Sequence, residues 1–163
     1  MLNFERPLGL FSYLFALTLL AVGCSSDTVT SIQQRKILNA NINNPLIKEY
    51  LWNISKEFDR NSIVAEDKYL FKPVEVQGVK LSGLDDGTDN ATVSINMSAT
   101  LPPNASWELW GASTKCLVKR SHPAVAMLQK NDELVLRGVF VSESSGLVMD
   151  RCRFWISRLG KWF

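Results

Sequence analysis

Three cysteines are the residues of this chain best suited to covalent chemistry, and they lie far apart in the sequence. Cys116 and Cys152 belong to the second half, whereas Cys24 directly follows an apolar run over residues 10–23 and precedes the polar residues 25–27. The run has 14 residues, whereas a helix that spans a bilayer needs about 20. A short apolar run with an abrupt polar stop is typical of a secretory export segment.

The residues before Cys24 resemble the lipobox of bacterial lipoproteins, in which the cysteine is acylated and becomes the first mature residue. Val22 and Gly23 fit the pattern, and Ala21 stands where leucine is more common. The resemblance implies a signal peptide over residues 1–23 and an anchor of several acyl chains, palmitate among them, which holds stably to a membrane. Ordinary cleavage after Gly23, or a buried N-terminal helix of a cytosolic protein, are the alternatives.

The number of cysteines favours acylation over ordinary cleavage. An odd count leaves one thiol unpaired in an exported protein. Acylation of Cys24 removes that thiol and leaves an even pair in an oxidising compartment, where disulfides persist. Ser25 in place of aspartate after the cysteine resembles lipoproteins that are passed to the outer membrane. We therefore expect a lipid-anchored protein of the outer membrane that faces the periplasm.

The other chemistry-bearing residues do not have the spacing of a catalytic or metal site. His122 is the single histidine and stands beside Pro123, where a capping or surface role is more common than catalysis. The chain contains no Gly-x-Ser-x-Gly, P-loop or His-Glu-x-x-His motif. Asp85, Asp86 and Asp89 lack the alternating spacing of a calcium loop and predict a polar turn. We expect no enzyme activity and no cofactor.

The mature chain has the size of one domain with a short leader. Removal of residues 1–23 from the 163-residue chain leaves 140 residues. Residues 24–44 are rich in Ser, Thr, Gln and Asn, which predicts a tether that clears the membrane, with room for a short helix over residues 31–39. The folded domain is expected over residues 45–163.

A helix followed by five strands is predicted for this domain. Asn44 and Pro45 suit the cap and first residue of an amphipathic helix that continues to Phe58. Alternation of apolar and polar residues then predicts a mainly β region with a short helix over residues 122–129. This order matches a five-stranded oligonucleotide/oligosaccharide-binding (OB) barrel with a helix between strands three and four. The predicted strands cover residues 74–81, 91–99, 107–118, 133–141 and 147–155, with 107–118 either one strand or two short pieces.

Two stretches resemble the bacterial tRNA anticodon-binding-like family of OB domains. Residues 61–69 (NSIVAEDKY) and 74–79 (VEVQGV) are similar to its Asn-x-x-Ala-Ala-Asp-x-x-Tyr run and Val-x-Val-x-Gly strand. The second half follows its Cys…Ala-x-Leu-x-Lys-Gly-Asp…Val-x-Gly…Cys pattern. Asn131 replaces the glycine and tolerates the left-handed conformation of that turn. Because strands three and five are neighbours in an OB barrel, the resemblance implies a Cys116–Cys152 disulfide; two buried free thiols are the alternative.

Two classes of partner are considered for the domain. One is an envelope protein or the cell wall, and the other is a single-stranded nucleic acid or another anionic polymer held by aromatic and basic residues. The net charge of +2 disfavours nucleic acid. The basic and aromatic C-terminus after Asp150 either binds a partner or membrane, or folds back on the core. The candidate contact residues are Trp107, Trp110, Lys115, Lys119, Arg120, Arg158, Lys161 and Trp162.

Overall fold

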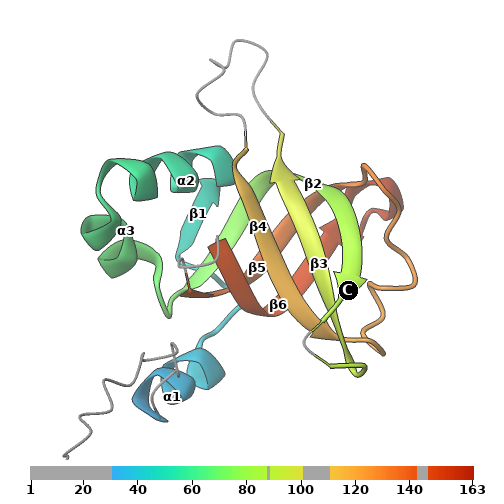
Figure 1. The fold of residues 1–163 in the computed structure, drawn as a ribbon, viewed down its shortest axis with the longest axis horizontal. Coiled ribbons are helices and arrows are strands. Elements are labelled where there is room, and N and C mark those ends of the chain that lie inside the picture. The colour runs from blue at the N-terminus through green and yellow to red at the C-terminus, as the bar shows by residue number, and fades with distance from the viewer. Residues whose placement is uncertain (1–30, 88, 101–110, 143–146) are drawn as a thin grey trace, which may run out of the picture.

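The computed structural model describes residues 31–87, 89–100, 111–142 and 147–163. Within these residues, three α-helices lie in the first part of the chain, with one short strand between the first two, and the strands of a curved sheet follow (Figure 1). The elements in chain order are α1 (Ser31–Asn39), β1 (Ile47–Tyr50), α2 (Leu51–Arg60), α3 (Ser62–Tyr69), β2 (Pro73–Asp86), β3 (Thr92–Ala99), β4 (Ser113–Lys119), β5 (Glu133–Ser142), β6 (Leu147–Ile156), the 3-10 helix η2 (Ser157–Leu159) and β7 (Lys161–Trp162).

Five strands close into a barrel. β2 pairs with both β3 and β5, and the remaining neighbours run β3–β4–β6–β5. β4 and β6 are parallel, whereas the other pairs around the barrel are antiparallel. β1 adds to β2 in parallel, and β7 adds to β6 in antiparallel orientation. The mixed five-stranded barrel confirms the predicted OB-like fold.

The strands form where the sequence alternates between apolar and polar residues. In β4, Thr114, Cys116 and Val118 are buried, and the residues between them face outward. Gly78 has a φ of 62° and lies at a register shift between β2 and β5, which marks a β-bulge. Asn131 has a φ of 70° and so adopts the predicted left-handed turn.

The helical pair α2–α3 contributes to the same core as the barrel. α2 buries an apolar stripe of Leu51, Ile54 and Phe58 and packs against strands of the sheet. Asn61 joins the two helices: its N–H donates to Glu57 O of α2, and its Oδ1 accepts from Val64 N of α3.

Two local predictions were wrong. The helix predicted from Pro45 begins only at Leu51, because residues 47–50 pair with β2 along the edge that β5 leaves open. Residues 122–129 form hydrogen-bonded turns in place of a regular helix. In these turns Val125 N donates to His122 O and Leu128 N donates to Ala124 O, so only one helical turn closes.

The N-terminal helix α1 confirms the short helix predicted within the tether over residues 24–44. It lies beside the barrel and apart from α2 and α3 (Figure 1). Its Ile37 is buried, whereas its other residues are exposed or half-buried. In the described part of the chain, no helix has the length and apolar character needed to cross a membrane.

Candidate interaction surfaces

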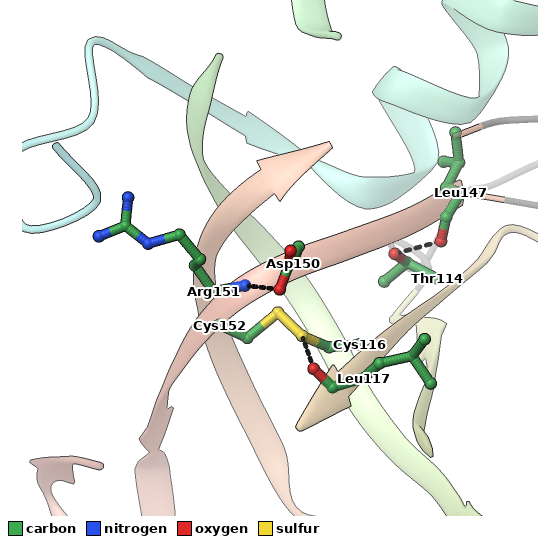
Figure 2. The surroundings of a disulfide bond; sticks show 7 residues. All are labelled: Thr114, Cys116, Leu117, Leu147, Asp150, Arg151 and Cys152. Atoms are coloured by element: carbon green, nitrogen blue, oxygen red, sulfur yellow. Dashed lines mark hydrogen bonds between the residues drawn. A yellow bond between two sulfur atoms is a disulfide. The ribbon is translucent and has the colours of Figure 1, made fainter. Parts of the chain in front are cut away.

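The disulfide lies at the seam of the barrel, between β4 and β6. These strands pair over only three positions, from Thr114↔Leu147 to Cys116↔Met149. The Thr114 hydroxyl donates to Leu147 O at 2.7 Å. At the last paired position of β4, the Cys116–Cys152 disulfide joins the two strands with a Cα–Cα distance of 6.4 Å (Figure 2). The bond confirms the pairing that the OB resemblance implied.

Close packing of β5 behind the seam requires a residue without a side chain. A Cβ atom on Gly138 would lie 2.9 Å from the carbonyl oxygen of Asp150 and 3.2 Å from Cys152 Sγ. The register between β5 and β6 also shifts at this point. The disulfide, the glycine and the bulge therefore form one local arrangement.

Arg151 lies within β6 at this bulge, and its side chain reaches the N-terminal helix. Its φ of 54° is left-handed, and its side chain points away from the disulfide (Figure 2). Nη1 donates to the carbonyl oxygens of Ile37, Leu38 and Ala40 at 2.7, 2.5 and 3.1 Å. Carbonyl groups at a helix C-terminus lack partners within the helix and carry partial negative charge. The guanidinium of β6 therefore caps α1.

A row of charged side chains crosses the outer face of the sheet, next to the contact between Arg151 and α1. Lys48, Glu75, Arg137 and Arg153 occupy neighbouring register positions on β1, β2, β5 and β6. Arg137 contacts Glu75 Oε2 at 2.8 Å through both Nε and Nη2. Burial raises the pKa of Glu75, but hydrogen bonds from Arg137 and Gln77 outweigh it and hold the pKa below its ordinary value.

The same row holds the chain that leads from α1 into the barrel. Arg137 Nη1 donates to Asn43 O at 3.0 Å, and Arg153 Nη1 donates to Asn43 Oδ1. The Trp162 ring lies over Arg137, 4.3 Å from its guanidinium carbon, and 5.9 Å from that of Arg153. Trp162 therefore makes cation–π contacts with both guanidinium groups and helps to hold them near Asn43.

The C-terminal residues fold back on the barrel. Phe163 and Phe154 exchange two backbone hydrogen bonds, and the Phe163 ring packs against the core. Lys161 is exposed with its Nζ 4.8 Å from the centre of that ring. The sequence left open whether this basic and aromatic segment binds a partner or membrane or folds back on the core. In the structure it folds back on the core.

Arg158 also has a structural role. Its Nε and Nη2 bind the two carboxylate oxygens of Asp132 at 2.9 and 3.1 Å, and Nη2 donates to Met127 O at 2.9 Å. Asp132 is 7% exposed and also accepts from Gln129 N. The Arg158 hydrogen bonds lower the pKa of Asp132. This pair joins η2 to the turns that precede β5.

The six predicted contact residues that the structure describes fall into two groups. Lys115 and Lys119 face outward from β4, and Arg120 follows them. Arg120 is bound to Asp86 Oδ1 at 2.6 Å and to Asn90 O at 3.0 Å. Trp107 and Trp110 lie outside the described residues. The remaining three, Arg158, Lys161 and Trp162, belong to the β6–β7 end of the barrel.

A shallow groove of about 420 Å³ lies beside the disulfide, and His122 lines it with Lys119, Asp150 and Arg151. His122 Nδ1 accepts from Ala124 N at 3.2 Å, and its ring meets Phe154 edge-on. Burial lowers the pKa of His122 and so favours the neutral ring that accepts this bond. The contacts give His122 the capping role considered from the sequence. Among the described residues, no three His, Cys, Asp or Glu side chains gather as metal ligands.

The fold defines a disulfide-bridged, OB-like β-barrel with an N-terminal helix held by arginines. No protein-family model, curated protein or solved structure matches the chain. The role of the barrel is therefore argued from its own residues.

Proposed function

We propose that this protein is a lipid-anchored protein of the bacterial cell envelope whose barrel serves as a non-catalytic interaction module. The Cys116–Cys152 disulfide carries the proposal. It uses two of the three cysteines and fits an oxidising compartment. Cys24, at the end of the apolar run, is left as the thiol available for acylation.

The outward face of β3 and β4 is the surface proposed to meet the partner. OB barrels use the corresponding strands to bind oligonucleotides and oligosaccharides. Here the face is largely polar, with Thr92 opposite Lys119 and Asn96 opposite Lys115, and the exposed Leu117 lies between them. Asn96 Nδ2 donates to Asp85 Oδ2 at 2.7 Å, which extends the polar surface onto β2. Hydrogen-bonding and cationic groups of this kind suit an envelope protein or a cell-wall glycan.

The anchor is tested by mass spectrometry of the protein isolated from cells. We expect a chain that begins at Cys24 and carries acyl chains, and we expect Cys24→Ser to abolish both the added mass and the membrane association. A chain that retains Met1, or an unmodified Cys24 in a water-soluble product, would contradict the proposal.

The binding face is tested by crosslinking in intact cells. Lys115→Glu with Lys119→Glu should reduce the yield of crosslinked partner at least tenfold, because two cations on the proposed face become anions. Lys56→Glu with Arg60→Glu makes the same charge change on exposed positions of α2 and should leave the yield unchanged. Tight binding of single-stranded oligonucleotides that weakens steeply with salt would instead support the anionic-polymer hypothesis.

A further inference from the structure

We propose that α1 is the surface on which the protein rests against an anionic bilayer, beside its own lipid anchor. The inference rests on the proposed acylation of Cys24 and adds an orientation to it. Its support comes from the side chains of α1, the length of chain to the anchor, and the way α1 is held to the barrel.

The side chains of α1 suit the interface of a negatively charged membrane. Arg35 and Lys36 are exposed, and the helix contains no acidic residue. Ile32 and Leu38 are each 68% exposed. Cations that bind anionic headgroups, combined with apolar side chains that enter the boundary of the acyl region, characterise helices that lie on membranes.

The anchor keeps α1 close to the bilayer. Ser31 lies seven positions after Cys24, and a fully extended chain spans at most about 3.6 Å per residue, or roughly 25 Å here. α1 is thereby confined to a thin layer at the membrane surface. Such confinement raises its effective concentration, so a contact that is weak in free solution becomes populated.

Because α1 is attached to the barrel, a membrane contact of α1 also orients the whole domain. Arg151 caps the C-terminus of α1, and the Ile37 side chain is 6% exposed. Arg137 and Arg153 hold Asn43 immediately after it. A bilayer contact at α1 therefore fixes which side of the barrel faces the membrane.

A bilayer fits this helix better than a second protein does. The exposed large apolar side chains of α1 are only Ile32 and Leu38, whereas a stable protein interface buries about 800 Å² on each partner. A membrane contact needs no such area because the acyl anchor already supplies most of the attachment.

Fluorescence in vesicles tests the contact on the acylated full-length protein. A polarity-sensitive dye attached to Ile32→Cys should shift to the blue and be quenched by lipid-borne quenchers in phosphatidylglycerol vesicles, and less so in phosphatidylcholine vesicles. The same dye on Ile63→Cys, a position of α3 that is 78% exposed, should report water in both. Equal signals at the two positions would overturn the inference.

The charge dependence supplies the matched control. Arg35→Glu with Lys36→Glu should abolish the shift at position 32, whereas Lys56→Glu with Arg60→Glu on α2 should preserve it. Hydrogen exchange of α1 amides in the two kinds of vesicle gives a second measurement without any dye. No additional protection of α1 in phosphatidylglycerol vesicles would contradict the contact.

The mass of Cys24, measured on the same samples, separates the two proposals. An acylated protein whose α1 stays in water contradicts the orientation alone. An unmodified Cys24 contradicts both the anchor and the orientation that depends on it.

Discussion

The barrel and the N-terminal segment over residues 31–44 are stabilised by different interactions. The barrel has a continuous apolar core, a closed ladder of strands and a disulfide. The N-terminal segment buries one apolar side chain, Ile37, and is held by hydrogen bonds from Arg151, Arg137 and Arg153.

This difference suggests that the two regions can be separated by mutation. Full burial of one large apolar side chain contributes about 1.5–3 kcal/mol, and the core contains many. A hydrogen bond to a charged group contributes roughly 1.5–3 kcal/mol when protected and less when exposed to water. Loss of the arginine contacts should therefore release α1 while the barrel stays folded.

The largest expected effect comes from the core. Phe154 is fully buried and pairs through its backbone with Phe163, so Phe154→Ala should reduce the free energy of unfolding by about 3–5 kcal/mol. Leu46→Ala, at a side chain that is 91% exposed, should change it by less than about 0.5 kcal/mol. Urea unfolding measures both. A loss below about 1 kcal/mol for Phe154→Ala would mean that the barrel does not depend on this core.

The disulfide should have the next largest effect. It closes a loop with a sequence separation of 36 residues, which corresponds to roughly 3–4 kcal/mol on the chain-entropy estimate. Cys116→Ala with Cys152→Ala should therefore lower the melting temperature by about 10 °C or more. Cys24→Ser leaves the bond intact and serves as the control. Equal melting temperatures for all three proteins would show that the seam needs no covalent bond.

Much of the barrel was predictable because its determinants are local. Alternation of residue type specifies which side of β4 or β6 faces the core, and Gly78 and Asn131 mark positions that need unusual backbone angles. The Cys116–Cys152 bond was implied by the resemblance to an OB barrel, in which strands three and five are neighbours, and the structure contains it.

The predictions failed where a distant segment decides the local structure. The apolar residues from position 46 onward have helical spacing, but residues 47–50 pair with the free edge of β2 and form β1. The contact between Arg151 and Ile37 joins residues 114 positions apart and depends on a bulge that no short motif records. The cations after Asp150 were a visible signal, but the alternatives considered for this segment were a partner or membrane and packing on the core. The structure instead assigns Arg151 and Arg153 to the chain's own N-terminal segment.

Acid should weaken both regions through different carboxylates. The pKa values of Asp132 and Glu75 lie below their ordinary values of 3.8 and 4.5. The folded state therefore binds fewer protons, and the stability that these groups contribute is present above those values and lost as the pH falls below them. Asp132→Asn should flatten the decline in barrel stability below about pH 4.

Glu75→Gln tests the contribution of the second carboxylate to the N-terminal segment. Glu75 binds Arg137, and Arg137 in turn donates to Asn43 O. This variant should flatten the decline in protection of residues 31–44. Asp59→Asn, at an exposed position of α2, is the control for both variants. Thermal unfolding and hydrogen exchange between pH 3 and 6 supply the measurements. Unchanged pH profiles in both variants would contradict the assignment of these groups.

The smallest effect on global stability, and the sharpest test of the comparison, is expected from Arg151→Ala. A nine-residue helix is marginal by itself in water, so loss of its cap should remove most hydrogen-exchange protection from α1. The free energy of barrel unfolding should change by about 1 kcal/mol or less, since the contacts involve only one side chain and backbone carbonyls. Arg120→Ala, which removes an exposed arginine bound to Asp86, should leave α1 protected. If Arg151→Ala lowers the protection of α1 and of β2 equally, the N-terminal segment and the barrel unfold as one cooperative unit. The two regions would then not be separable by mutation.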